Sequence, residues 1–271
     1  MIMRKVGFVG AGVMAEALAR GMFRADAASP SSVYASDPSE ERRRIFAGMI
    51  LRANVLPNNL RLVEACRVIV LSVKPNIVPD VAREIRAALS RNHLVVSVAA
   101  GVTLARLRGL LQTDRLVRIM PNTPALVGQA ASAYCPAVGA TAEDAALVEE
   151  MLRSVGLCVR VEESLMDAVT GLSGSGPAYV YLAVEALAEG GVREGLSRDT
   201  ALRLAAQTVL GAAKMVIETG KDPAQLREEV TTPGGTTEEG LAVLEAANFR
   251  RALVEAVAAA AERSRRMGAG R

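Results

Sequence analysis

The first part of the chain alternates short apolar runs with longer stretches whose apolar residues recur at helical spacing. The apolar runs cover residues 5–9, 32–35, 68–73, 94–99, 116–120, 131–135 and 158–161. The helical stretches between them include 13–23, 40–47, 78–89, 104–111 and 142–155. A run as apolar and β-branched as 68–73 is typical of a parallel strand covered on both faces. The alternation predicts a doubly wound parallel sheet, an α/β fold of about eight strands.

The strand signals stop after Glu163, where long helical segments begin. We therefore predict a sheet-containing domain over residues 1–162 and an all-helical domain over 163–271. Within the second domain, a small-residue turn over 172–178 opens the first long helix. The predicted helices of this domain begin near Pro177, Ser197, Asp222 and Asn248. Their apolar faces exceed what a lone globule buries, so this domain is expected to mediate oligomerisation.

A glycine turn joins the first predicted strand to the first predicted helix. Gly10-x-Gly12-x-x-Ala15 is the dinucleotide fingerprint in its form that ends with alanine. Gly10 makes the tight turn, Gly12 lets the pyrophosphate come close, and Ala15 lets the helix pack against the strand. Asp37 ends the second predicted strand, roughly 20 residues further on, where the fingerprint places an acidic residue. The N-terminal domain is therefore predicted to be a Rossmann domain that binds a dinucleotide.

Asp37 leaves the phosphate state of the cofactor open. A carboxylate at this position ordinarily holds the ribose hydroxyls of NAD and repels the 2′-phosphate of NADP. Either Asp37 or Ser39 is also suited to cap the helix that follows. The three arginines Arg42, Arg43 and Arg44 lie just beyond, and any of them can compensate a phosphate.

Two proline-containing loops follow predicted strands of the sheet. Pro75 forces an extended exit from the 68–73 strand and places Lys74 at the carboxyl end, where α/β sheets bind ligands. The loop 120–125 carries Asn122 between two prolines. Such a loop can place amide groups beside a nicotinamide ring, although a plain turn uses the same residues.

The segment 230–241 combines a Pro-Gly-Gly turn with four threonines at the start of a predicted helix. Thr236 and Glu239 have the spacing of a capping box, which predicts a helix N-terminus at Thr236 and free N–H groups that suit an anion. Gly234 and Gly235 let a ligand approach the backbone. The alternative is a capped helix without a ligand.

Composition excludes several classes of protein. Hydrophobic residues make up 51% and charged residues 23% of the 271 residues, which is typical of a globular protein. The net charge of +3 and the scattered basic residues do not indicate nucleic-acid binding. Three cysteines far apart and one histidine argue against a metal site or a disulfide framework. No segment has the ~18 apolar residues of a membrane span, so a cytoplasmic enzyme is expected.

Five motifs together resemble one family, the pyrroline-5-carboxylate reductases, over essentially the whole chain. They are Val6-Gly-Phe-Val-Gly-Ala-Gly12 with Met14-Ala15, Val73-Lys-Pro75, Met120-Pro-Asn-Thr-Pro124, Ser173-Gly-Ser-Gly-Pro-Ala-Tyr179 and Val230-Thr-Thr-Pro-Gly-Gly-Thr-Thr237. The resemblance implies reduction of 1-pyrroline-5-carboxylate to L-proline by hydride transfer from NADPH or NADH. It also implies a homodimer or a pentamer of dimers, built through the helical domain.

The resemblance implies roles for particular residues. The cofactor residues are Gly10, Gly12, Val13, Met14, Ser36, Asp37, Asn59, Val73, Lys74, Pro75 and Asn122. The residues around the substrate carboxylate are Thr231, Thr232, Gly234, Gly235, Thr236 and Thr237. Thr237 is expected to hydrogen-bond the imine nitrogen and is the one catalytic residue, with no metal involved.

Three positions depart from the family pattern. Val13 replaces a polar residue, Thr232 replaces a serine while keeping the hydroxyl, and Asp37 weakens the expectation of NADPH. Two alternatives remain at this point: a β-hydroxyacid dehydrogenase and a non-catalytic NAD(P)-binding protein. The first needs a catalytic lysine on the helical domain, where only Lys214 and Lys221 occur. The second needs no substrate loop.

Overall fold

The computed structural model describes residues 5–50 and 53–268, and its chain divides into two compact units. The first unit takes in the chain up to Ser175 together with the chain from Ala258 onward, and the second is Gly176–Val257. This division by contacts differs from the predicted domains of residues 1–162 and 163–271, and the predicted boundary stays a prediction.

The first unit contains one sheet in the order β3-β2-β1-β4-β5-β6-β7-β8. Its strands are β1 (Val6–Val9), β2 (Val33–Ser36), β3 (Asn54–Leu56), β4 (Val68–Leu71), β5 (Leu94–Ser97), β6 (Leu116–Met120), β7 (Ala130–Pro136) and β8 (Gly156–Arg160). The first six strands are mutually parallel, and the order reverses beside β1. This is the doubly wound arrangement, with its switch point between β1 and β4.

One part of the sheet differs from the predicted parallel arrangement. β7 pairs antiparallel to β6, and β8 pairs parallel to β7. The connection from β6 to β7 holds only the short 3₁₀ helix η3 (Thr123–Val127), whereas a parallel crossover needs about a dozen residues or more. The prediction also lacked β3, whose three residues are too few to form a recognisable apolar run.

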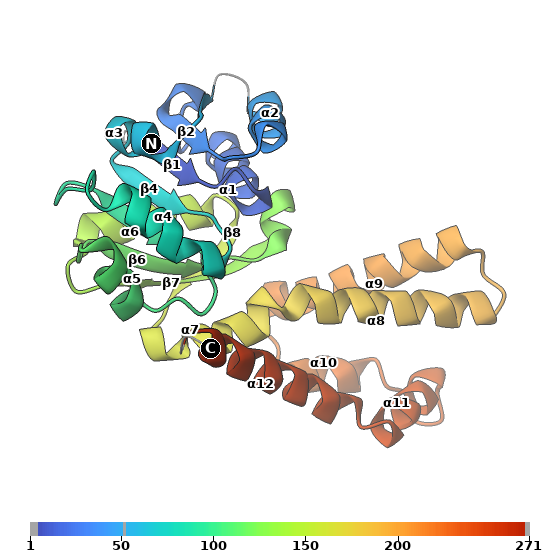
Figure 1. Ribbon diagram of the computed structural model, residues 1–271. Helices are drawn as coiled ribbons and strands as arrows, with labels where there is room; N and C mark the ends of the chain where they lie inside the picture. Colours follow the sequence, from blue (N-terminus) through green and yellow to red (C-terminus); the bar gives the residue numbers. More distant parts are fainter. Residues whose placement is uncertain (1–4, 51–52, 269–271) are drawn as a thin grey trace. The chain divides into compact units, whose positions relative to one another are not determined.

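Helices cover both faces of the sheet (Figure 1). They are α1 (Val13–Arg24), α2 (Glu40–Met49), α3 (Asn59–Ala65), α4 (Val78–Ile85), α5 (Leu104–Leu111) and α6 (Ala142–Arg153), followed by the short α7 (Met166–Val169). Successive strand residues enter different cores, since Phe8 packs with the α1 and α6 side and Val9 with the α3, α4 and α5 side. The two cores explain why the inner strands are apolar throughout.

The second unit is helical. Its helices are α8 (Gly176–Arg193), α9 (Arg198–Thr219), α10 (Pro223–Glu229), α11 (Thr236–Ala246) and the first part of α12 (Phe249–Gly268). Ser197 and Asp222 cap α9 and α10 as predicted, by accepting hydrogen bonds from Thr200 N and Ala224 N. The predicted small-residue turn is wrong in its first part, because a π-helical segment, Thr170–Gly174, continues α7.

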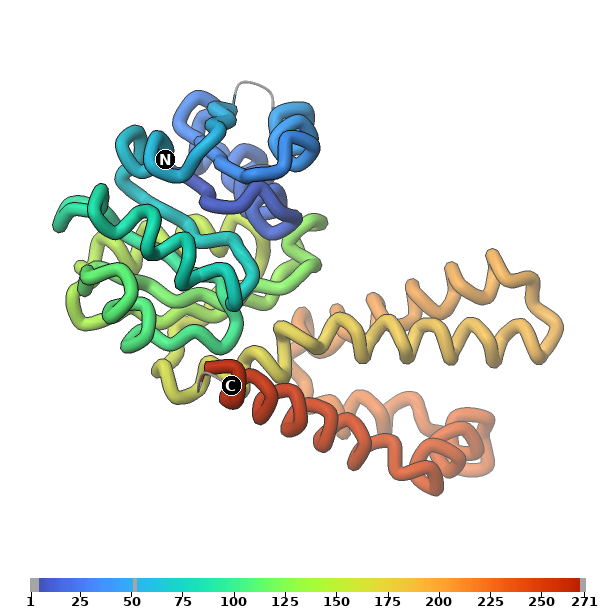
Figure 2. The backbone as a smooth tube through the Cα atoms, in the orientation of Figure 1, coloured from blue at the N-terminus to red at the C-terminus, as the bar shows by residue number. Residues whose placement is uncertain are grey.

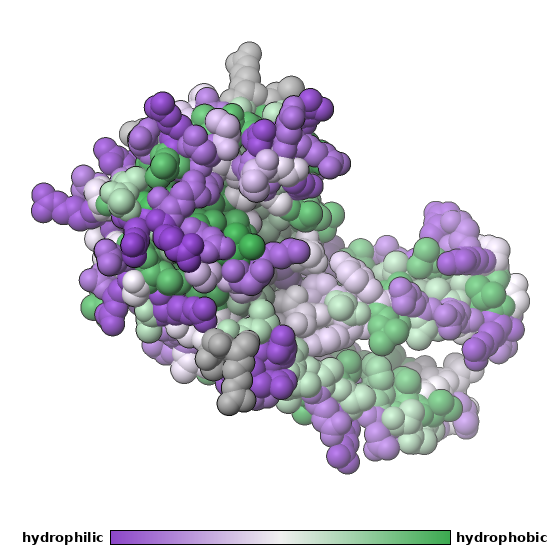
Figure 3. Space-filling model, viewed as in Figure 1, coloured by the Kyte–Doolittle hydropathy of each residue, from purple (hydrophilic) through white to green (hydrophobic). Residues whose placement is uncertain are grey.

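Helices α8 and α9 form an antiparallel hairpin, and Figure 2 shows the chain reversing between them. Their shared core is small and consists of Ala188, Ala201 and Ala205 with Val184. Large apolar side chains of this unit are exposed, including Ile217 at 80% and Val243 at 70%. Green apolar residues accordingly lie on the surface of these helices in Figure 3. Exposed apolar surface of this kind is typical of an interaction site.

The last part of α12 belongs to the first unit and is fixed there by polar contacts. Ser264 Oγ donates to Asp167 Oδ1 at 2.5 Å, and the buried guanidinium of Arg118 lies 3.5 Å from the same carboxylate and 3.6 Å from Glu163. Gly101, at φ +74°, leaves room for the helix end, because a Cβ there would lie 2.9 Å from Met267 Cβ. In the described ranges no helix combines the length and apolar character needed to cross a bilayer.

Candidate cofactor and substrate sites

A cavity of about 810 Å³ lies at the carboxyl ends of β1, β2 and β4, beside the switch point of the sheet. Many of the predicted cofactor residues line it: Gly10, Gly12, Ser36, Asp37, Asn59, Val73 and Lys74. Val13, Met14, Pro75 and Asn122 are not among its lining residues. The structure thus brings most of the predicted set together, and the contacts of each residue with a cofactor stay predictions.

The glycine turn at this cavity fits a bound pyrophosphate. Gly10 has φ +95°, and a Cβ there would lie 2.5 Å from the carbonyl oxygen of Ser72, so the turn requires glycine. At Gly12, by contrast, a Cβ would meet nothing within 4 Å and would project into open space. Gly12 is the N-cap of α1 and offers no side-chain cap. The N–H groups of the first turn of α1 are therefore left for an anion, as dinucleotide binding requires.

The carboxylate of Asp37 is engaged by the backbone on both sides of the turn. Its Oδ2 accepts from Ala11 N at 3.0 Å, and its Oδ1 accepts from Ser39 N at 2.9 Å. The cap of α2 is Ser39, whose hydroxyl accepts from Arg42 N at 3.3 Å. Of the two predicted candidates for the cap of α2, Ser39 is confirmed and Asp37 is not the cap, while contact of Asp37 with the ribose stays a prediction.

Arg42 reaches from α2 to the same turn. The sequence had left open which of the three arginines lies near the cofactor. Its Nε and Nη2 donate to Ala11 O at 3.1 and 2.8 Å, and its guanidinium pairs with Glu16. Arg43 donates to the carbonyl oxygen of Asp37 at 2.6 Å, and Arg44 pairs with Glu40 at 2.6 Å. All three arginines thus have partners within the chain.

Asn59 is held in a chain of hydrogen bonds at the adenosine end expected from the resemblance. Ser36 Oγ donates to Asn59 Oδ1 at 2.7 Å, and Asn59 Nδ2 donates to Glu84 Oε2 at 2.7 Å. Asp80 and Glu84 line the cavity and were missed by the sequence analysis. They lie on the predicted helix that became α4, and polar residues on one face of an amphipathic helix are usually exposed to solvent, so nothing in the sequence pointed to a ligand there.

The side chain of Asn122 links two segments of the first unit. Its Nδ2 donates to Ser173 O at 3.0 Å, and its Oδ1 accepts from Ala131 N at 3.0 Å. It is 7% exposed. The amide therefore stabilises the loop before β7, and its predicted place beside a nicotinamide ring stays a prediction.

The threonine loop lies in the second unit and is a tight turn. Gly235 N donates to Thr232 O at 2.8 Å, Gly234 has φ +69°, and Thr231 Oγ1 donates to Arg227 O at 2.6 Å. These bonds form without any side chain from outside the segment. The loop is therefore held by hydrogen bonds among its own residues and to the preceding helix.

The predicted capping box of Thr236 and Glu239 is wrong. Helix α11 begins at Thr236 with Gly235 as its N-cap, and no side chain caps it. The carboxylate that folds back is that of Glu238, which accepts from Gly234 N at 2.6 Å. The helix starts at Thr236, as predicted, but because its N-cap is Gly235 and not Thr236, the third helical residue is Glu238. The N–H groups of Thr236 and Thr237 remain at an uncapped helix N-terminus.

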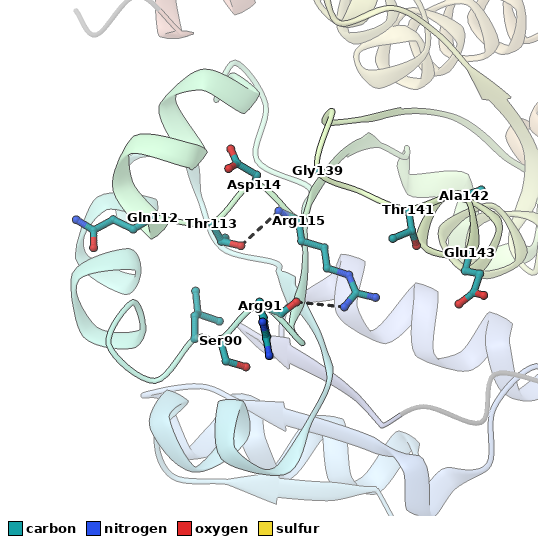
Figure 4. A pocket seen from close by; sticks show the side chains of 11 residues that line it. Ser90, Arg91, Gln112, Thr113, Asp114, Arg115, Gly139, Thr141, Ala142 and Glu143 are labelled. Atoms are coloured by element: carbon teal, nitrogen blue, oxygen red, sulfur yellow. Dashed lines mark hydrogen bonds between the residues drawn. The ribbon is translucent and has the colours of Figure 1, made fainter.

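A second cavity, of about 780 Å³, lies at the amino ends of β5 and β6, the opposite edge of the sheet (Figure 4). The guanidinium of Arg115, one of two arginines that line this cavity, is fully engaged: Nε and Nη2 donate to Asp144 at 2.6 and 2.8 Å. Nη1 lies 3.4 Å from Arg91 O and 3.3 Å from Asn92 O. Burial works to raise the pKa of Asp144, but the hydrogen bonds from Arg115 and Thr141 outweigh it and hold that pKa below its usual value. This cluster is structural.

The thiols provide no reactive group. Cys66, Cys135 and Cys158 are free and buried, and burial raises the pKa of Cys66 to about 12 and that of Cys158 to about 11. Thiolates are thus disfavoured at neutral pH. Within the described residues, no three or more His, Cys, Asp or Glu side chains gather as a metal site would require.

Comparison with known proteins gives two family matches and close full-length relatives. Residues 163–267 match the family described as pyrroline-5-carboxylate reductase dimerisation, and residues 5–101 match that described as NADP oxidoreductase, coenzyme F420-dependent. The pyrroline-5-carboxylate reductase of Arabidopsis thaliana is 48% identical over 97% of this chain and 95% of its own length. The enzyme of that name from Methanosarcina acetivorans is 44% identical over 98% of both chains.

A solved structure agrees with these matches. The crystal structure of Plasmodium falciparum pyrroline carboxylate reductase with NADP bound has a TM-score of 0.90 to this chain. It is 34% identical and covers 99% of each chain. The sequence identity and the structural similarity both extend over nearly the whole chain and so over both compact units. The chain belongs to the pyrroline-5-carboxylate reductase family.

Proposed function

We propose that this protein reduces 1-pyrroline-5-carboxylate to L-proline with NADPH or NADH as the hydride donor. One observation supports it best: the chain has both a dinucleotide cavity and a threonine-glycine turn at a helix N-terminus without a side-chain cap. The same chain matches pyrroline-5-carboxylate reductases along its length. The cavity suits a nicotinamide cofactor, and the turn suits the carboxylate of a small acid.

In this proposal the first unit binds the cofactor. Gly10 and Gly12 receive the pyrophosphate, Asp37 and Asn59 lie toward the adenosine, and Lys74 lies at the end of β4. When bound, the dihydronicotinamide supplies the hydride, and the protein contributes binding and orientation. Val13, Met14, Ser36, Val73, Pro75 and Asn122 complete the proposed set of cofactor residues.

The loop from Thr231 to Thr237 holds the substrate carboxylate through backbone N–H groups and hydroxyls. Its residues Thr232, Gly234, Gly235 and Thr236 form the turn and the first residue of α11. The N–H of Gly234 donates to the carboxylate of Glu238, so this N–H can bind an anion. In the proposed complex the substrate carboxylate replaces that of Glu238. In this proposal the hydroxyl oxygen of Thr237 accepts a hydrogen bond from the N–H of the protonated imine. Because a threonine hydroxyl is a poor proton source, water supplies the proton to the ring nitrogen.

We propose a homodimer formed through the helical domain, with pentamers of dimers as the larger assembly. The match of residues 163–267 to a dimerisation family and the exposed apolar side chains of α8 to α12 support association. We keep the division into domains of residues 1–162 and 163–271 for this purpose. The cytoplasm is the proposed compartment, with 1-pyrroline-5-carboxylate as the partner and neither nucleic acid nor membrane involved.

The alternative of a β-hydroxyacid dehydrogenase lacks its lysine. Lys214 Nζ lies 3.5 Å from Glu218 on the same helix, and Lys221, in the connection between α9 and α10, has its Nζ 2.8 Å from Glu229, so both side chains are paired. A non-catalytic NAD(P)-binding protein has no need of the threonine-glycine turn. Neither alternative is favoured by a described contact.

Steady-state kinetics test the proposal directly. Oxidation of NADH and of NADPH is followed by absorbance with 1-pyrroline-5-carboxylate as the substrate. Reduction of NAD⁺ and of NADP⁺ is followed in the same way with a set of 3-hydroxy acids. We expect turnover with the imine and none with the hydroxy acids. Turnover of the hydroxy acids alone would instead establish the dehydrogenase.

A further inference from the structure

The glycine turn of the cofactor cavity is held by the second strand and the second helix, through the side chains of Asp37 and Arg42, which also line the cavity. Gly10 N donates to Ser36 O at 2.8 Å, and Ala11 N donates to Asp37 Oδ2 at 3.0 Å. The carbonyl oxygen of Ala11 accepts two hydrogen bonds from Arg42. Ala11 is fully buried, so both polar groups of this residue are satisfied by the second strand and the second helix.

The contact between Arg42 and Ala11 fixes the direction of the next donor. The C=O of Ala11 and the N–H of Gly12 belong to one planar trans peptide and point in opposite directions. Arg42 therefore sets the orientation of the Gly12 N–H by holding Ala11 O. Gly12 lines the cofactor cavity and is the residue at which the fingerprint brings the pyrophosphate close to the backbone.

Glu16 completes this arrangement from the first helix. Its side chain is 6% exposed and pairs with Nη2 of Arg42, the same nitrogen that donates to Ala11 O. A buried carboxylate with a single cationic partner keeps that partner in place, because separation leaves the charge unpaired. Arg42 lines the cofactor cavity together with Ser36 and Asp37, but two of its three guanidinium nitrogens, Nε and Nη2, are engaged by Ala11 O and Glu16.

We propose that Arg42, held by Glu16, is a positioning residue for the pyrophosphate-binding turn and does not read the 2′-phosphate. This rests on the proposed function only in that the cofactor is a nicotinamide dinucleotide. The two proposals fail separately: binding of NADH and NADPH to the substrate-free enzyme tests this one, whereas turnover of the imine tests the other.

The test measures dissociation constants of NADH and NADPH by titration calorimetry, without substrate, for wild type, Arg42→Gln, Glu16→Gln and Arg44→Gln. Arg42→Gln is expected to weaken both cofactors by the same factor, about tenfold, the loss of one charge-assisted hydrogen bond. The ratio of the two constants stays within about twofold of wild type. Glu16→Gln acts in the same direction by a smaller factor. Arg44→Gln, which removes an exposed pair with Glu40, is the matched control and leaves both constants unchanged.

Further readouts separate positioning from a general loss of structure. Arg42→Lys, which can donate to Ala11 O but lacks the fork, restores part of the affinity for both cofactors. In Arg42→Gln, the kcat at saturating cofactor stays at the wild-type value while the cofactor KM rises. If Arg42→Gln fails to fold, the double variant Glu16→Gln/Arg42→Gln, which leaves no unpaired buried charge, takes its place. Weakening of NADPH alone, tighter NADPH in Glu16→Gln, or unchanged affinity for both cofactors in Arg42→Gln would each overturn the proposal.

Discussion

Replacement of Thr237 by alanine is the most direct test of the proposed substrate site. Thr237 is the second residue of α11 and is half-buried, and no hydrogen bond of its hydroxyl occurs among the described residues. The free protein therefore loses no described contact, and alanine suits a helix at least as well as threonine. The whole cost falls on the bound imine. A hydrogen bond to a charged group contributes about 1.5–3 kcal/mol, so kcat/KM is expected to fall roughly 10- to 150-fold.

The assay follows oxidation of NADH or NADPH at varied 1-pyrroline-5-carboxylate, with cofactor dissociation constants measured separately. Thr208→Ala is the matched control, because it makes the same chemical change on α9, outside the proposed substrate site. We expect Thr237→Ala to keep wild-type cofactor affinity and thermal stability. An unchanged kcat/KM, or an equal loss in Thr208→Ala, would refute the assignment of the imine contact to Thr237.

Three further outcomes are expected. Glu238→Gln removes a negative charge beside the Gly234 N–H and should lower the KM for 1-pyrroline-5-carboxylate about two- to fivefold at constant kcat. Glu239→Gln is the control. An unaltered KM in Glu238→Gln would exclude the Gly234 N–H from the carboxylate site. Ser132 carries a buried hydroxyl for which the described residues supply no partner, so Ser132→Ala should raise the free energy of unfolding by about 1 kcal/mol in urea denaturation, and a loss of stability would contradict this. The lowered pKa of Asp144 means that its contribution to stability is complete above about pH 4 and is lost as pH falls through the folded-state value; in Asp144→Asn, acid titrations of stability should lack that component.

The sequence predicted most strands of the fold because inner parallel strands are apolar on both faces. The predicted runs 5–9, 68–73 and 116–120 are of this kind, and the structure confirms them as β1, β4 and β6. The direction of β7 was wrong although the information was present, since the short connection after Met120 permits only a hairpin. β3 has three residues and begins with an asparagine, so a local pattern cannot reveal it.

The site was less predictable where a side chain acts through distant partners. The spacing that favours a cap at Thr236 exists also one residue earlier, from Gly235 to Glu238, and only the turn geometry decides between them. The pairing of Arg42 with Glu16 joins two helices that are separate in the sequence. Residue types at a strand end indicate a ligand, but which groups satisfy one another is decided by tertiary packing.

The end of α12 in the first unit has a consequence for the order of events during synthesis. The contact between Ser264 and Asp167, and the packing of Met267 at Gly101, require a segment that leaves the ribosome after the whole second unit. A nascent chain that has reached Ser175 therefore holds every strand of the sheet but not the helix end that packs against it. Until α12 is made, the half-buried carboxylate of Asp167 beside Arg118 lacks the Ser264 hydroxyl, and the surface at Gly101 is uncovered. Completion of the cofactor-binding unit thus waits for the helical unit to be synthesised, which links the folding of the two.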